Sequence, residues 1–369
     1  MTDTGQLKSS RVSPLVEDAE NGLVRVTLAC RDDEADGVWV VGGPAGADPG
    51  DRWMRRADDG WWERTYELPR DVRTTYSFTR VREPGFSDLR HDPLNPRTHF
   101  YPRVPDDPDD VDIVASVLEG PDAPPFRWST ARHGVPRGAV EKHRVSSARL
   151  DNERDVFVYT PPGYDATQTY PLLVCFDGWG YVNEAYVPTQ TVLDNLLADG
   201  RIPPLVAVLP DSLGQETRMR ELLLDEPFVE FLAEELLPWA HGRWSLTRDP
   251  AQTVVAGSSA GGLTAAFAAL RRPDLFGLVL SQSGAYGHGS LPGEYAAADR
   301  LPLRFYLDVG MLETHVYKSR AAILHANRHL RDVLLARGCD VTYREFPGGH
   351  DYLWWRETIA DGLVALLGR

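Results

Sequence analysis

The chain has 369 residues, of which 42% are hydrophobic and 25% charged, and this composition excludes a disordered, a collagen-like and a coiled-coil protein. Its length leaves room for two domains. The 39 Lys and Arg residues against 54 Asp and Glu residues give a formal net charge of -15, which disfavours nucleic acid and anionic membranes as partners.

The location of the protein is predicted from what the chain does not contain. We find no apolar run of signal-peptide type near the start, and no stretch approaches the roughly 18 apolar residues of a membrane-spanning helix. Cys30, Cys175 and Cys339 are widely spaced and odd in number, which fits neither a disulfide framework nor a metal-binding motif. We therefore expect a cytoplasmic protein without a metal site of its own.

The first third of the chain has the pattern of an antiparallel β domain. Short runs rich in Val, Trp, Tyr and Thr alternate with Gly, Pro and Asp turns, which predicts a small β-sandwich over residues 1–125. The predicted strands are residues 23–28, 38–41, 61–68 and 74–79. Proline-bearing stretches at 105–112 and 120–125 mark the boundary, and residues 126–144 are predicted as a linker.

Residues 145–369 are predicted to form an α/β domain. Continuous apolar runs, typical of strands buried on both faces, alternate with helical segments at 227–240 and 262–270. The runs, with a preceding strand at 155–160, are residues 171–176, 205–209, 253–256, 278–280 and 303–307. This alternation predicts a mostly parallel sheet flanked by helices, with ligands bound at the carboxyl ends of its strands.

Residues 257–261 read Gly-Ser-Ser-Ala-Gly and match the pattern G-x-S-x-G with Ser259 at the centre. The pattern follows a predicted strand and opens a predicted helix, which is the setting of a nucleophilic serine on a tight strand-to-helix turn. The N-terminus of that helix offers free N–H groups to a developing oxyanion. We expect Ser259 to be the nucleophile and Ala260 N–H to be one oxyanion donor.

A serine nucleophile of this kind requires an acid and then a histidine downstream. His350 lies in a glycine-rich turn after the last predicted strand, residues 341–346, and it would take the proton of Ser259 and return it to the leaving alcohol. Two carboxylates follow the strand at 303–307. We expect Glu313 to be the acid, because a loop beyond the strand can bring its long side chain under His350, and Asp308 remains the alternative.

The second oxyanion donor is expected in the loop that follows the strand at 171–176. This loop, residues 177–181, reads Asp-Gly-Trp-Gly-Tyr, and its glycines allow the backbone to come close to a substrate. Trp179 N–H is the predicted donor.

Several further motifs carry a family resemblance. From about residue 38 onward the chain resembles the enterochelin (enterobactin) esterases, and its C-terminal two-thirds resemble the esterase D type of α/β hydrolase. The motifs are Asp92-Pro93-Leu94-Asn95-Pro96, Asp177-Gly178, Arg218-Met219-Arg220-Glu221-Leu222, Glu235-Leu236-Leu237-Pro238, Ser281-Gln282-Ser283-Gly284-Ala285-Tyr286, and Gly349-His350-Asp351 with Trp355-Arg356. The resemblance implies an immunoglobulin-like N-terminal domain beside an α/β-hydrolase domain. It also implies a cytoplasmic enzyme that hydrolyses ester bonds of catecholate siderophores to release iron.

The resemblance further implies how the substrate is bound. Arg218 would face the catecholate or its iron. From their residue type rather than from the resemblance, Trp179, Tyr181 and Tyr286 are expected to offer aromatic walls for the site. A ferric tris-catecholate is an anion, so a protein of this charge needs a local basic patch to hold it, and guanidinium groups suit aromatic rings and their oxygens. No cofactor is expected, since any iron arrives with the small-molecule substrate. The alternatives are a serine hydrolase or transacylase acting on a peptide or polyketide ester of secondary metabolism, and a siderophore-binding protein without turnover.

Overall fold

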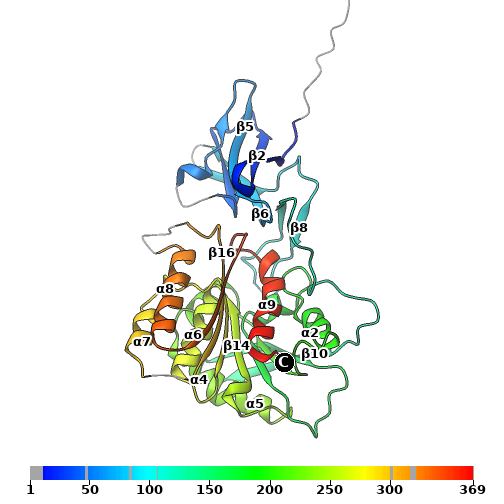
Figure 1. The fold of residues 1–369 in the computed structure, drawn as a ribbon, viewed down its shortest axis with the longest axis vertical. Helices are drawn as coiled ribbons and strands as arrows, with labels where there is room; N and C mark the ends of the chain where they lie inside the picture. The colour runs from blue at the N-terminus through cyan, green and yellow to red at the C-terminus, as the bar shows by residue number, and fades with distance from the viewer. Residues whose placement is uncertain are drawn as a thin grey trace, which may run out of the picture. The chain divides into compact units, whose positions relative to one another are not determined.

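The computed structural model describes residues 11–45, 49–82, 85–105, 107–299, 302–315 and 321–368 (Figure 1). The chain divides into two units. One comprises Met1–Phe100 and Val114–Pro124, and the other comprises Tyr101–Ile113 and Pro125–Arg369. The acidic stretch 105–112, which the sequence placed in the β domain, therefore belongs wholly to the C-terminal unit. Within the described ranges, no helix combines the length and hydropathy that a bilayer-spanning segment requires.

The N-terminal unit is built from two β-sheets. The first has the strand order β1 (Leu15–Asp18), β2 (Leu23–Arg31), β5 (Trp61–Pro69) and β4 (Arg55–Arg56), all antiparallel. The second has the order β3 (Gly37–Gly42), β6 (Arg73–Arg82), β9 (Ile113–Glu119) and β8 (Thr98–Tyr101), with β7 (Gly85–Arg90) also paired to β6. The four predicted strands are present as β2, β3, β5 and β6.

Alternation explains why these segments form strands with one buried face. In β2, Val24, Val26 and Leu28 are fully buried, while Arg25 between them is exposed. Successive side chains of a strand point to opposite faces, so this period-two pattern directs one face of the strand toward the core. Two short 3-10 turns, Glu20–Gly22 and Pro49–Arg52, connect strands of this unit.

The C-terminal unit contains a single eight-stranded sheet. Its order is β10 (Ala139–Ser147), β11 (Asn152–Thr160), β13 (Val206–Pro210), β12 (Leu172–Cys175), β14 (Thr253–Ser258), β15 (Leu278–Gln282), β16 (Arg304–Gly310) and β17 (Asp340–Phe346). The β10–β11 and β11–β13 pairs are antiparallel, and every other neighbouring pair is parallel. The mostly parallel sheet predicted from the apolar runs is present.

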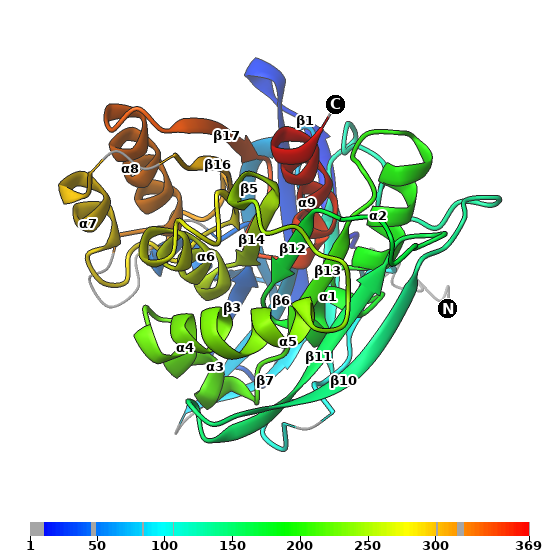
Figure 2. The same cartoon turned by 90° about the horizontal axis from the view of Figure 1, so that it is seen from below.

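Helices cover both faces of this sheet (Figure 2). They are α1 (Gly178–Val182), α2 (Thr189–Ala198), α3 (Gln215–Glu221), α4 (Glu226–Phe231), a π turn (Leu232–Leu236), α5 (Leu237–His241), α6 (Ala260–Arg271), α7 (Leu291–Ala297), α8 (Ile323–Ala336) and α9 (Tyr352–Leu367). The predicted helix at 227–240 is present as α4, the π turn and α5. Pro238 is the second residue of α5 and has no N–H to continue a regular α-helix, which accounts for the π turn before it.

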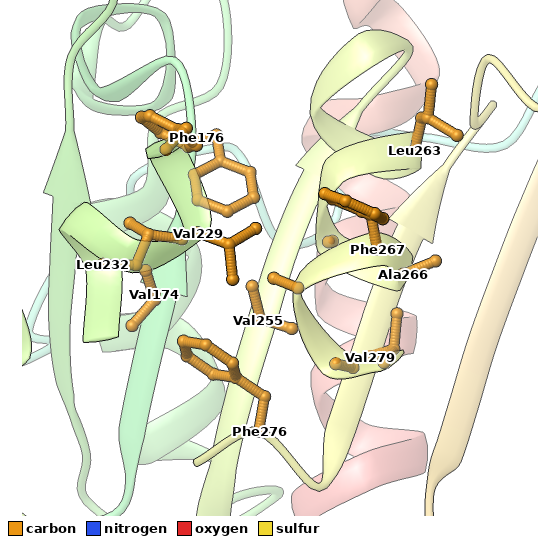
Figure 3. Packing of buried hydrophobic residues seen from close by; sticks show 14 of the residues in the cluster. Val174, Phe176, Val229, Leu232, Val255, Leu263, Ala266, Phe267, Phe276 and Val279 are labelled. Atoms are coloured by element: carbon orange, nitrogen blue, oxygen red, sulfur yellow. The ribbon is translucent and has the colours of Figure 1, made fainter. Parts of the chain in front are cut away.

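The strand residues are divided between two hydrophobic cores. Leu172 and Val174 of β12 contribute to the core shared with α4, α5, α6 and α8, while Leu173 and Cys175 contribute to the core shared with α2 and α9. Figure 3 shows part of the first core, where Val174 and Val255 from the sheet pack near Val229 and Phe267 from the helices. Burial on both faces is why these strands are continuous apolar runs in the sequence.

The prediction of a linker at 126–144 is wrong. Trp128 is buried in the core of the C-terminal unit, and the Glu357 carboxylate of α9 accepts hydrogen bonds from the backbone N–H groups of residues 127–129. Strand β10 then begins at Ala139 and pairs with β11 along its whole length. Its central residues are Glu141, Lys142, His143 and Arg144. Charged residues are typical of an exposed edge strand, and they hid this strand from a search for apolar runs.

Candidate active site

Ser259 lies between the end of β14 and the first residue of α6. Its backbone has φ 56° and ψ -118°, a conformation that a residue with a side chain adopts only at a cost of about 1–3 kcal/mol. The backbone of the neighbouring strand holds this turn, since Ser259 N–H donates to the carbonyl of Gln282 at 2.9 Å and Ala285 N–H donates to the carbonyl of Ser259 at 2.9 Å. A Cβ atom at Gly257 would lie 2.7 Å from the backbone of Gly261, so the turn requires a small residue there.

His350 is held by Glu313. The Nδ1 atom of His350 lies 2.5 Å from Glu313 Oε2, and the side chain of Glu313 is only 2% exposed. The other carboxylate oxygen, Oε1, accepts hydrogen bonds from Ser283 Oγ at 2.5 Å and from Gly310 N–H at 2.7 Å. The ring of Trp355 packs edge-on against the imidazole, with centroids 4.8 Å apart. These contacts fix the orientation of the imidazole and leave its Nε2 atom for another partner.

Asp308, the alternative acid, has a different environment. It lies within β16 and is fully buried, and neither of its carboxyl oxygens has a hydrogen-bond partner among the described residues. Burial raises its pKa to about 8. The structure thus brings Glu313, and not Asp308, to His350.

Ser259 and His350 open into one cavity of about 530 Å³ in the C-terminal unit. Its described lining includes aromatic side chains, one arginine and several aspartates. The lining residues are Val104, Asp107, Asp109, Asp110, Asp177, Trp179, Gly180, Tyr186, Asp211, Ser212, Gly214, Gln215, Arg218, Ser258, Ser259, His350, Tyr352 and Trp355. Among the described residues, no group of His, Cys, Asp or Glu side chains is arranged to hold a metal ion.

The two predicted oxyanion donors, Ala260 N–H and Trp179 N–H, differ in whether they already have a hydrogen-bond partner in the structure. Ala260 is the first residue of α6, so its N–H group belongs to the helical turn that has no carbonyl partner within the helix. Trp179 N–H instead donates to Asp211 Oδ1 at 2.9 Å. Residues 178–182 form the short helix α1 and not the open loop that was expected. The prediction of Trp179 N–H as the second donor is therefore not met in this structure, although Trp179 itself lines the cavity.

Arg218 lies on α3 and lines the cavity, as expected, but its guanidinium group already has a partner. Nε and Nη2 donate to the two carboxylate oxygens of Asp177, each at 2.7 Å. Ser212 Oγ donates to the same carboxylate at 2.9 Å. Asp177 follows β12 in a left-handed conformation, with φ 57°. Its ion pair with Arg218 therefore connects the segment after β12 to helix α3. The positive charge of Arg218 is thus largely neutralised before any substrate binds.

The prediction that Tyr286 forms a wall of the site is wrong. Its side chain is 3% exposed and packs in the core between the sheet and α6. Its hydroxyl group donates to Ser281 Oγ at 2.7 Å and lies 3.2 Å from the carbonyl oxygen of Gly262. The aromatic rings that line the cavity besides Trp179 are Tyr186, Tyr352 and Trp355, none of which the sequence singled out as a wall.

The expected basic patch is also absent from the described lining of the cavity. Arg218 is the one arginine there, against five aspartates. Three of these, Asp107, Asp109 and Asp110, come from the acidic segment that the sequence analysis used only as a domain boundary. The high density of aspartate in this segment was the available signal, but the segment was interpreted only as a domain boundary.

Comparison with known proteins identifies the relatives of the chain. The model of the esterase family matches residues 147–366. The chain belongs to the esterase family. Its activity class is therefore ester hydrolysis, as the serine motif predicted.

The relatives extend over nearly the whole chain. The iron(III) enterobactin esterase of Dickeya dadantii is 30% identical, covering 96% of this chain and 90% of the relative. The solved ferric enterobactin esterase of Salmonella typhimurium superimposes with a TM-score of 0.77 at 27% identity, over 97% of each chain. The enterobactin esterase of Shigella flexneri, solved in the presence of enterobactin, has a TM-score of 0.74 at 28% identity over 96% of each chain. The resemblance inferred from the motifs is confirmed.

Proposed function

We propose that the protein is a serine esterase that hydrolyses the ester or lactone bonds of a catecholate siderophore of the enterobactin type. The observation that carries the proposal is that Glu313 holds His350, and that His350 lines the same cavity as Ser259 on its strained turn. Relatives named as enterobactin esterases that match over nearly the full length of the chain support the choice of substrate.

The proposed chemistry is acyl transfer through the serine. Ser259 Oγ attacks the ester carbonyl carbon while His350 Nε2 takes its proton, and the Glu313 carboxylate stabilises the imidazolium that forms. The carbonyl oxygen becomes an oxyanion, to which Ala260 N–H donates. The carbon–oxygen bond then breaks, His350 returns the proton to the leaving alcohol, and the acyl group stays on Ser259. Water, activated by His350, hydrolyses this acyl-enzyme and releases the acid.

Trp179, Tyr186 and Tyr352 are proposed as the surface for the catechol rings, since all three line the cavity and pack against one another. Arg218 is proposed to bind substrate oxygen through the part of its guanidinium group that Asp177 does not occupy.

The proposal extends to the remaining parts of the protein. The two antiparallel sheets of the N-terminal unit are proposed to form a domain of the immunoglobulin-like type. Both Cys30 and Cys175 are buried free thiols, which supports a cytoplasmic location. We propose that the enzyme needs no cofactor, since the serine mechanism is complete without one.

Mass spectrometry of the products tests this function. The protein is incubated with a catecholate trilactone, with and without ferric iron, beside Ser259→Ala and the control Ser290→Ala, which alters a serine outside the cavity lining. We expect opening of the ring to add the mass of one water and each later cut to split the linear product with uptake of another water, in the wild type and in Ser290→Ala but not in Ser259→Ala. An intact trilactone, together with Ser259-dependent turnover of a simple aryl ester, would instead favour an esterase of secondary metabolism.

A further inference from the structure

The charge of the cavity differs from what an anionic substrate requires. Five aspartates, one arginine and His350 are the described Asp, Glu, Lys, Arg and His side chains of its lining. Arg218 and Asp177 form a two-pronged ion pair and cancel each other. Among the described residues of the lining, four aspartates therefore remain without a paired positive charge. They are Asp107, Asp109, Asp110 and Asp211.

Three of these carboxylates accept hydrogen bonds from neutral groups, and the fourth, Asp109, accepts none among the described residues. Asp107 accepts hydrogen bonds from the backbone N–H groups of Gln215 and Asp109, each at 3.1 Å, and Asp110 accepts one from Val104 N–H at 2.8 Å. Asp211 accepts from Trp179 N–H. No ion pair joins any of the four to a Lys, Arg or His among the described residues. An amide donor holds a carboxylate in place without cancelling its charge, so the negative field reaches the cavity.

The titration of neighbouring groups is consistent with this field. The pKa of Asp211 is raised to about 6, chiefly by burial and further by the charges of Asp177 and Asp155. The pKa of Tyr352 is raised to about 12, again chiefly by burial, with Asp177 and Asp110 raising it further and Arg218 lowering it. In both groups burial is the largest cause, and neighbouring carboxylates add to it.

The aromatic residues of the lining also favour a substrate without negative charge. Tyr186 and Tyr352 meet edge to face with centroids 4.8 Å apart, and Trp179 meets Tyr186 at 5.3 Å. The faces of such rings attract cations and stack on uncharged aromatic rings, while they offer nothing specific to an anion. Rings and uncompensated carboxylates together suit a substrate that is neutral or positively charged.

We propose that this cavity selects its ester by charge, accepting an iron-free or amine-bearing catecholate ester and discriminating against the ferric tris-catecholate anion. An iron-free catechol is protonated and uncharged at neutral pH, whereas three doubly ionised catechols around Fe³⁺ leave a net charge of -3. The inference rests on the proposed function and names the state in which the substrate is cut. A substrate with ammonium groups on its ester backbone is bound more tightly still, because the same carboxylates attract the positive charges.

The test is a charge series of substrates. The specificity constant kcat/KM is measured for a ferric trilactone, the same trilactone without iron, and an iron-free trilactone that carries ammonium groups. We expect kcat/KM to rise in this order, with the iron-free form preferred over the ferric form by about tenfold or more. The preference should shrink in high salt, since screening acts within about 10 Å at 0.1 M ionic strength.

Asp109→Asn is the variant that probes the field most cleanly. Asp109 is exposed, and its carboxylate makes no hydrogen bond in the described structure, so the change removes charge without disturbing the loop. A charge of -3 about 10 Å away in water interacts strongly enough that removing the Asp109 charge should raise kcat/KM for the ferric substrate by about eightfold at low salt, and by about twofold at 0.1 M salt. Asp299→Asn is the matched control, because Asp299 is an exposed aspartate outside the cavity lining.

The outcomes separate the two proposals. A wild-type preference for the ferric substrate, or equal effects of Asp109→Asn and Asp299→Asn on the ferric to iron-free ratio, would overturn charge selection while leaving the esterase function intact. If no trilactone is cut in any state, the proposed substrate is wrong. Charge selection is then judged on aryl esters bearing an ammonium, a neutral or a carboxylate group, with the same order expected.

Discussion

Replacing Glu313 by Gln probes the acid of the proposed triad through a change of almost no volume. Glu313 Oε1 accepts from two donors, Ser283 Oγ and Gly310 N–H, and the backbone donor cannot be reversed. The amide oxygen of Gln therefore occupies this position, and its NH₂ group faces His350 Nδ1. The amide then donates to Nδ1, so the proton of the neutral imidazole sits on Nε2, where it cannot accept the proton of Ser259.

The size of the effect follows from that tautomer. Amide replacement of the acid in a serine triad lowers kcat by about 10⁴-fold, or about 5 kcal/mol of transition-state stabilisation. KM should change by less than about twofold, because Glu313 is buried and does not line the cavity. The melting temperature should change little, since the hydrogen bonds to Oε1 are kept.

Steady-state kinetics on a catecholate trilactone or an aryl ester measure this effect, with a thermal melt to show that the fold is intact. Asp308→Asn is the matched control, because Asp308 lies near the same strand end but makes no contact with His350. We expect kcat of this control to stay within about threefold of the wild type. If Glu313→Gln keeps most of its kcat and Asp308→Asn loses about 10³-fold, the acid is Asp308 and the reasoning is wrong.

Three other changes test stability and packing. Burial raises the pKa of Asp308 from near 4 to about 8, so the native state loses about 3–4 kcal/mol of stability as pH rises from 5 to 8. Asp308→Asn removes this loss, and thermal melts should show that the variant's gain in stability over the wild type grows from pH 5 to pH 8. The side chains of the Arg154–Glu221 ion pair are 1% and 2% exposed, so Glu221→Ala leaves a buried guanidinium group without its partner. Denaturant melts should show a loss of about 3–5 kcal/mol in the free energy of unfolding, and a loss below about 1 kcal/mol would contradict this reasoning. Tyr286→Phe should leave KM unchanged and cost about 1 kcal/mol, whereas a severalfold rise in KM would return Tyr286 to the substrate wall.

Local sequence patterns were enough to predict the parallel part of the sheet of the C-terminal unit and the turn at Ser259. The parallel strands are apolar over their whole length because both faces are covered, and the nucleophile turn depends on small residues within a few positions of Ser259. The choice between Glu313 and Asp308 was argued from loop length alone. The structure supplies the physical reason, since Ser283 and Gly310 hold the carboxylate of Glu313 against His350.

Other features had no local pattern from which they could be predicted. Strand β10 is polar at its centre because it lies at a sheet edge, and a strand of that composition does not differ from a linker until its partner β11 is known. The sequence at Tyr286 is the same whether its ring faces the cavity or the core, and in the structure the ring packs in the core against α6. Trp179 N–H is occupied by Asp211, a residue that follows a different strand.

The chemistry of the protein was thus determined by its sequence, and the environment of that chemistry by its tertiary structure. Acyl transfer to serine needs a few residue types at fixed spacing, which can be recognised in one dimension. The charge of the cavity depends on contacts between distant segments, such as Asp107 with Gln215 and Asp177 with Arg218. A charged side chain acquires its effect from the groups that surround it, and only the fold brings those groups together.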